Sequence, residues 1–65
     1  MKIVINGETH DFQSQTLEEV LIALGHRDAK VATAVNEEFC PTSLRATVLI
    51  KEGDRIEIVA PRQGG

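Results

Sequence analysis

The residues of this sequence best suited to chemistry are its last two, Gly64 and Gly65. Because glycine has no Cβ, two glycines in a row can enter a slot that would exclude any other residue. A thin tail that ends in a carboxylate can therefore be presented to the active site of another protein. The alternative is a frayed chain end, since the last residues of domains are commonly loose. The two interpretations can be distinguished only from the rest of the sequence.

The side chains that most often act in catalysis or metal binding are scattered along the chain. Cys40 is the only cysteine and stands in an apolar stretch just before Pro41. A buried, inert thiol is favoured there over a nucleophile, because free cysteine commonly behaves as a small hydrophobic residue. His10 and His26 are isolated, with no CxxC or HxxxH spacing nearby. The sequence thus predicts no catalytic residue and no metal site.

Two pairs of neighbouring carboxylates, Glu18-Glu19 and Glu37-Glu38, are candidates for acid–base catalysis. Stabilisation of the first turn of a helix explains the first pair better, and solvation of a loop explains the second. Gly53 is a single turn glycine and not part of a phosphate-binding loop. We therefore expect a protein without enzymatic activity and without a bound cofactor.

Composition places the chain among ordinary globular proteins, with 42% apolar and 26% charged residues in a length of 65. Phe12 and Phe39 are the only aromatic residues and the net charge is −3, which argues against direct contact with nucleic acid. The single cysteine allows no intrachain disulfide, and the sequence contains no secretory signal. It also lacks an apolar run of about 18 residues that could span a membrane. We expect a cytoplasmic protein with no membrane partner.

The first half of the chain predicts a hairpin and a helix. Residues 2–5 and 8–12 are rich in strand-forming residues and flank Asn6-Gly7, the strongest short-range hairpin pattern. Thr16 and Glu19 have the spacing of a capping box, and residues 17–24 repeat apolar side chains on one helical face. Gly25 stands where a glycine commonly ends a helix.

The second half predicts three further strands. Residues 31–36 form one strand and residues 37–40 a shorter one that Pro41 stops. Residues 42–50 have mixed periodicity, which indicates a loop or a helical turn with residues 48–50 partly buried. A turn at residues 52–54 precedes an alternating final strand at 55–59.

This order predicts an α+β fold in which a mixed sheet of four to five strands packs on one α-helix. The first and last strands can pair in parallel at the centre, because the elements between them supply the long crossover that parallel pairing requires. Alternation directs Val4 and Val59 to the open face of the sheet, where they form a possible docking face. The inward set of residues 31–35 stays open between Val31/Thr33/Val35 and Ala32/Ala34.

These features resemble the ubiquitin-like β-grasp sulfur carriers, and most closely the ThiS-type carriers of bacterial thiamin biosynthesis. The resemblance covers essentially the whole chain and includes Asn6-Gly7, one capped helix, Ala34-Val35-Asn36, Cys40-Pro41 where the family often has Val-Pro, residues 52–59, and Gly64-Gly65. The chain departs from the family at Thr42 and Arg45, where relatives often have an arginine and an aromatic residue. The resemblance implies one β-grasp domain at 1–60 and a flexible tail at 61–65.

The resemblance also implies a mechanism in which every catalytic group belongs to a partner. A ThiF-type enzyme would use ATP to adenylate the carboxylate of Gly65. A persulfide from a cysteine desulfurase or another donor would replace AMP, and reduction would leave a thiocarboxylate. A ThiG-type thiazole synthase would take up this sulfur to build the thiazole ring.

In this mechanism the tail residues Pro61, Arg62, Gln63, Gly64 and Gly65 thread into the active site of the partner. Five residues span at most about 17 Å. Pro61 fixes its own φ and so lowers the entropy lost when the tail becomes ordered. Arg62 either pairs with an acidic tunnel mouth or only aids solubility.

Two other functions stay open at this point. A related β-grasp carrier would supply sulfur for tRNA thiolation or for the molybdopterin precursor, starting from the same Gly65. A β-grasp interaction module would carry no chemistry on its tail.

Overall fold

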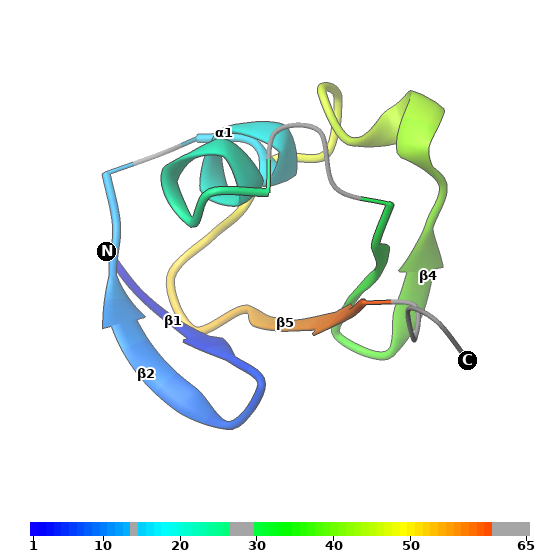
Figure 1. The fold of residues 1–65 in the computed structure, drawn as a ribbon. Coiled ribbons are helices and arrows are strands. Elements are labelled where there is room, and N and C mark those ends of the chain that lie inside the picture. The colour runs from blue at the N-terminus through cyan, green and yellow to red at the C-terminus, as the bar shows by residue number, and fades with distance from the viewer. Residues whose placement is uncertain (14, 27–29, 61–65) are drawn as a thin grey trace.

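The structure is a computed structural model that describes residues 1–13, 15–26 and 30–60. It contains five strands in one sheet and one α-helix, with a short 3-10 helix in the last connection. Figure 1 shows α1 packed over one side of the curved sheet, while no helix of the described residues covers the other side. This is the α+β arrangement that the sequence predicts.

The first hairpin has the predicted form. Strands β1 (Lys2–Ile5) and β2 (Glu8–Asp11) pair antiparallel around Asn6 and Gly7. The turn residues have φ values of 50° and 86°, in the left-handed region where asparagine and glycine are the most tolerated residues.

A second hairpin joins β3 (Ala32–Val35) to β4 (Glu38–Cys40). Its turn is formed by Asn36 and Glu37, with φ values of 51° and 71°. The predicted boundaries are wrong here, because the structure places Asn36 and Glu37 in the turn, whereas the sequence predicts strands at 31–36 and 37–40. A glutamate at φ 71° is uncommon. Asn36 is therefore the only residue of the two whose type indicates a turn.

Strand β5 (Arg55–Val59) lies in the middle of the sheet, whose order is β2-β1-β5-β3-β4. It pairs in parallel with β1 and antiparallel with β3. The predicted parallel pairing of the first and last strands is confirmed.

Helix α1 (Leu17–Ala23) has defined caps at both ends. The Thr16 hydroxyl accepts a hydrogen bond from the Glu19 N–H, and the Glu19 side chain accepts one from the Thr16 N–H, so the predicted capping box is present. At the other end Gly25 has φ 87° and its N–H donates to the Ile22 carbonyl, while the His26 N–H donates to the Leu21 carbonyl. This pair of bonds is a Schellman motif, which the predicted C-terminal glycine makes possible.

The hydrophobic core lies between α1 and one face of the sheet. The apolar helical face predicted within residues 17–24, formed by Leu17, Val20, Leu21 and Leu24, is in it or packed against it. The buried members of the core are Ile3, Ile5, Leu17, Val20, Leu21, Val31, Cys40, Ile50 and Ile56. In β3 the inward set is now settled, since Val31 and Thr33 are buried and Ala32 is exposed. The alternation that the sequence left open is therefore Val31/Thr33/Val35.

The connection from β4 to β5 passes beside the start of the helix. It begins with the 3-10 helix η1 (Thr42–Leu44), the helical turn that the sequence allowed. The Arg45 and Val48 carbonyls accept hydrogen bonds from the first helical N–H groups, of Glu18 and Leu17. Ile50 is buried, as expected for this segment, whereas Leu49 is 66% exposed. Among the described residues, no helix has the length and apolarity needed to cross a membrane.

Candidate functional site

Strand β5 is the element that leads directly into the predicted tail. Its central place in the sheet gives it a neighbour on each side, and the pairing with β3 continues to its last residue, Val59, opposite Ala32. The predicted site residues Pro61, Arg62, Gln63, Gly64 and Gly65 lie outside the described residues. Their roles, and the division of the chain at residue 61, stay predictions.

The beginning of β5 is held by the turn of the second hairpin. The Asn36 N–H donates to the Arg55 carbonyl at 2.7 Å, and the Asn36 Oδ1 accepts from the Arg55 N–H at 3.0 Å. The Asn36 Nδ2 also donates to the carboxylate of Asp54 at 3.0 Å. Asp54 is buried and accepts a second bond, from the Lys51 N–H at 2.7 Å. This network links the turn before β5 to the β3–β4 hairpin.

The end of β5 is held by the turn of the first hairpin. The Asn6 N–H donates to the Ile56 carbonyl at 2.9 Å. Its side chain continues the pattern, because Oδ1 accepts from the Ile58 N–H at 2.8 Å and Nδ2 donates to the Ile58 carbonyl at 3.1 Å. The two asparagines at left-handed φ thus hold β5 near its two ends. The sequence identified Asn6 only as a turn residue, since an asparagine side chain that bonds a distant strand leaves no local pattern.

The open face of the sheet carries the predicted docking residues Val4 and Val59. Val59 is 64% exposed and Val4 is half-buried. Val4 lies opposite Arg55 in the register, so Arg55 and Glu57 separate it from Val59 along β5. The two valines therefore share a face without forming one continuous apolar patch.

Small and apolar residues gather on the β3–β4 side of this face instead. Ala32 lies opposite Val59, Ala34 lies opposite Glu57, and Phe39 pairs with Ala34 on β4. Phe39 is 69% exposed, the largest exposed fraction among the exposed large hydrophobic side chains of the described residues. Phe39 is not among the predicted docking residues, although its alternation with Cys40, predicted to be buried, is a signal that places it on the open face.

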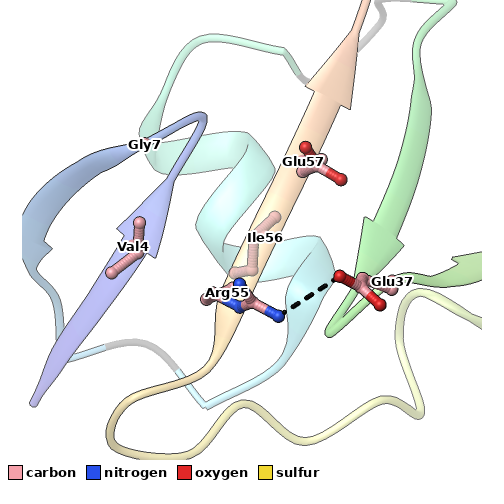
Figure 2. Close-up of a pocket in the computed structure, with 6 residues that line it drawn as sticks. All are labelled: Val4, Gly7, Glu37, Arg55, Ile56 and Glu57. Atoms are coloured by element: carbon pink, nitrogen blue, oxygen red, sulfur yellow. Dashed lines mark hydrogen bonds and ion pairs between the residues drawn. The ribbon is translucent and has the colours of Figure 1, made fainter.

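A shallow hollow of about 190 Å³ lies on the open face between β1, β5 and the Asn36-Glu37 turn. Figure 2 shows its lining, with Arg55 reaching from β5 toward Glu37 and the helix behind the strands. The Arg55 Nη2 lies 3.5 Å from the Glu37 Oε2, and both side chains are largely exposed. An exposed pair of this kind contributes little to stability and leaves both charges available to a partner.

Among the remaining reactive side chains, the predicted burial of Cys40 is confirmed. Cys40 is a free, buried cysteine whose Sγ contacts the Pro41 carbonyl at 3.6 Å. The His10 Nε2 lies 3.7 Å from a carboxylate oxygen of the exposed Glu8. Within the three described segments, no group of three or more His, Cys, Asp or Glu residues is arranged to hold a metal ion.

Glu19 shows the predicted stabilising role at the start of the helix. Hydrogen bonds from the backbone N–H groups of Gln15 and Thr16 lower the pKa of its carboxyl below the usual value. A carboxylate that is ionised and committed to two backbone donors is suited to capping and poorly suited to proton transfer near neutral pH.

Arg45, one of the departures from the family pattern, is buried. Its guanidinium donates to the Val31 carbonyl, and its Nε has no hydrogen-bond partner among the described residues. Arg45 thus ties the residue before β3 to the connection beside the start of the helix, so the departure from the family pattern makes a buried hydrogen-bonding contact.

Comparison with known proteins gives consistent results over the whole chain. Residues 3–65 match the ThiS family. A sulfur carrier protein ThiS from Thermus thermophilus is 36% identical over 94% of this chain and 95% of its own length. A thiazole synthase from Paramagnetospirillum magneticum is 47% identical over all of this chain, which spans only 20% of that relative. A thiazole synthase from Magnetococcus marinus is 38% identical over all of this chain, which again spans only 20% of that relative.

Solved structures agree with the fold. The crystal structure of a thiamine biosynthesis protein ThiS from Geobacter metallireducens superimposes with a TM-score of 0.84 at 25% identity, and covers all of both chains. The β-grasp arrangement of five strands and one helix is therefore the arrangement of this group. With the family match across residues 3–65, the chain belongs to the ThiS family.

Proposed function

We propose that the chain is a sulfur carrier of thiamin biosynthesis whose Gly65 carboxylate is converted to a thiocarboxylate. The observation that carries the proposal is that the family match extends to residue 65 and so includes both glycines. A relative that this chain covers almost end to end is itself named a sulfur carrier protein. The central position of β5 adds support, because it gives the proposed tail a firmly held starting point.

The chemistry begins with activation of the carboxylate by a ThiF-type partner. A carboxylate resists nucleophilic attack and has no good leaving group. Its oxygen attacks the α-phosphorus of ATP and pyrophosphate leaves, which converts the carboxylate to an acyl adenylate. The protein needs only to present this one group, since the partner supplies the nucleotide site and the catalytic side chains.

Sulfur enters from a persulfide on a second partner, such as a cysteine desulfurase. The terminal persulfide sulfur attacks the carboxyl carbon and AMP leaves, which forms an acyl disulfide. A thiol reductant then supplies two electrons to cleave the S–S bond, so the carrier keeps a thiocarboxylate and the donor recovers its thiol. No side chain of the carrier takes part in these steps.

A ThiG-type thiazole synthase is the proposed acceptor of the sulfur. Its support comes from the two relatives named thiazole synthase, each of which contains a segment that matches this whole chain. A carrier-like segment within the polypeptide of a synthase is expected if the two proteins work together. We propose that Val59 and Val4, with their neighbours on the open face, contact the partners.

The experiment that tests the proposal is intact-mass analysis after incubation with a ThiF-type enzyme, ATP and a persulfide donor. The expected product is the chain with one oxygen replaced by sulfur, and the tandem mass spectrum should place the change on Gly65. The absence of any sulfur-bearing species would overturn the carrier and leave an interaction module. A thiolated protein that yields no thiazole with thiazole synthase and its substrates would move the assignment to another acceptor.

Two tail variants serve as controls for the position of the chemistry. Deletion of Gly65, or addition of one residue after it, should abolish thiolation, while the thermal unfolding temperature stays that of the wild type. Thiolation of the extended protein would show that the free carboxylate of Gly65 is not the acceptor.

A further inference from the structure

The β1 strand ends before the β5 strand that it supports. The last paired residues of the two strands are Ile5 and Ile56, whereas β5 continues to Val59. On its other side, β5 is paired with β3 up to Val59. The N–H and the carbonyl of Ile58 point toward β1, but β1 has already ended at this level of the sheet. No backbone group of β1 is therefore in place to bond them.

The Asn6 side chain fills this position. Its Oδ1 accepts from the Ile58 N–H at 2.8 Å and its Nδ2 donates to the Ile58 carbonyl at 3.1 Å. The amide thus acts as one further residue of β1. It satisfies a donor and an acceptor at once, which neither a carboxylate nor a hydrocarbon side chain can do.

The backbone at Asn6 narrows the choice of residue further. Its φ of 50° lies in the left-handed region, where asparagine and glycine are the residues most readily accepted. Glycine fits this backbone but has no amide. Asparagine alone meets both requirements, for the turn and for the bonds to Ile58.

We infer that Asn6 is a positioning residue for the carboxylate of Gly65, an inference that rests on the function proposed above. β3 pairs with Val59 on one side of β5, and Asn6 closes the last bonds on the other side, so that the end of the strand is held from both sides. Six residues then separate Val59 from the end, a reach of at most about 21 Å. A looser origin spreads the carboxylate over a larger volume and reduces the fraction of docked molecules in which it reaches the nucleotide.

Asn36 supplies a matched control for Asn6. It has nearly the same φ, 51°, and also bonds the β5 backbone through its side chain. Its partner is Arg55, at the opposite end of the strand from the tail. Asn6→Gly and Asn36→Gly therefore make the same substitution in turns of similar φ, and each removes two side-chain hydrogen bonds. Asn36→Gly also takes away a hydrogen-bond partner of the buried Asp54 carboxylate, so it should destabilise the protein at least as much as Asn6→Gly. Only Asn6 acts at the end of β5 that precedes the tail.

The test measures two quantities in both variants of the full chain. The first is amide hydrogen exchange at Ile58, which Asn6→Gly should accelerate by roughly ten-fold, the equivalent of about one net hydrogen bond. The second is steady-state adenylation by the ThiF-type enzyme. Asn6→Gly should lower kcat by roughly ten-fold and leave KM within about two-fold, since docking is intact and only delivery of the carboxylate is impaired. Asn36→Gly should leave kcat unchanged.

The outcomes separate this inference from the proposed function. Unchanged exchange at Ile58 in Asn6→Gly, or faster exchange with a wild-type kcat, overturns the positioning role. An equal loss of kcat in Asn36→Gly also overturns it, because general destabilisation would then explain both. A wild-type protein that is never adenylated overturns the proposed function itself, whatever the exchange shows.

If Asn6→Gly does not fold, Asn6→Asp takes its place in the kinetic measurement. A carboxylate keeps the acceptor for the Ile58 N–H, so exchange there should stay near that of the wild type, while loss of the donor to the Ile58 carbonyl should still lower kcat. A wild-type kcat in Asn6→Asp would then overturn the positioning role.

Discussion

Ile56 and Glu57 are neighbours in β5, yet their side chains serve different surfaces. Ile56 is 1% exposed and lies in the core under α1, whereas Glu57 is exposed on the open face at the rim of the hollow. The comparison extends to the whole sheet, because alternation places Ile3 and Ile5 with Ile56, and Val4 with Glu57.

The difference between the faces shows how a small domain can separate the residues needed for stability from the residues available for binding. A chain of this size buries a limited core, so nearly every inward residue is needed for stability. The exposed residues of the open face contribute much less to stability. Their charges and small apolar groups can therefore vary without loss of the fold, as a partner-binding surface would require. One strand thereby anchors the fold with one set of side chains and leaves the other set exposed, where the proposed partner contacts would form.

The largest expected effect is on the helix side. Ile56→Ala should lower the free energy of unfolding by about 3 kcal/mol, because it removes buried methyl groups and leaves a cavity. Glu57→Ala, one residue away on the open face, should change it by less than about 0.5 kcal/mol. Urea denaturation followed by circular dichroism measures both values. Similar losses of stability in the two variants would show that the two faces of β5 contribute equally to the stability of the fold.

The next effect is on partner binding through the open face, and rests on the proposed function. Val59→Asp should raise the KM for adenylation by about ten-fold, because a carboxylate at a contact must be desolvated. Its stability should remain near that of the wild type, since Val59 is 64% exposed. Ala46→Asp adds the same charge at an exposed residue of the connection beside the helix, and should leave KM unchanged. Equal KM values for the two variants would show that Val59 lies outside the docking face.

A smaller effect is expected at the second hairpin turn. Glu37→Gly relieves a non-glycine residue at φ 71°, which should stabilise the protein by up to about 1 kcal/mol. The same change removes the exposed ion pair with Arg55, which contributes well below that amount. Thermal unfolding should therefore show a raised midpoint. A lowered midpoint would mean that the ion pair between Glu37 and Arg55 stabilises the fold by more than the strain at Glu37 destabilises it.

The sequence predicted those parts of the fold that depend on local patterns. Asn6-Gly7, the capping box of Thr16 and Glu19, and Gly25 each specify one backbone geometry, and each appears where expected. The turn at Asn36 was missed because Glu37 has no intrinsic preference for a left-handed φ.

The candidate site was less accessible from sequence, because its contacts join distant residues. The bonds from Asn6 to Ile58 span 52 positions, and the pairing of Phe39 with Ala34 depends on the missed turn. Val4 and Val59 were correctly placed on one face by alternation, but only the register shows that Arg55 and Glu57 lie between them.

The smallest effect concerns the outer start of the helix and tests whether the helix side owes part of its stability to charge. The folded-state pKa of Glu19 is lowered by the N–H groups of Gln15 and Thr16. Its stabilising contribution is therefore complete above the ordinary glutamate value of about 4.3 and is lost as the pH falls through the lowered pKa.

Glu19→Gln keeps an oxygen for the capping box but has no charge to titrate. Its urea midpoint should fall less between pH 7 and pH 3 than that of the wild type. Glu18→Gln changes the neighbouring first-turn carboxylate, while the two backbone donors remain bound to Glu19, and should keep the wild-type difference. If Glu19→Gln loses as much stability in acid as the wild type, the bonds from Gln15 and Thr16 do not govern the acid response. The larger contribution of the helix side to stability would then come from apolar packing and not from this charged cap.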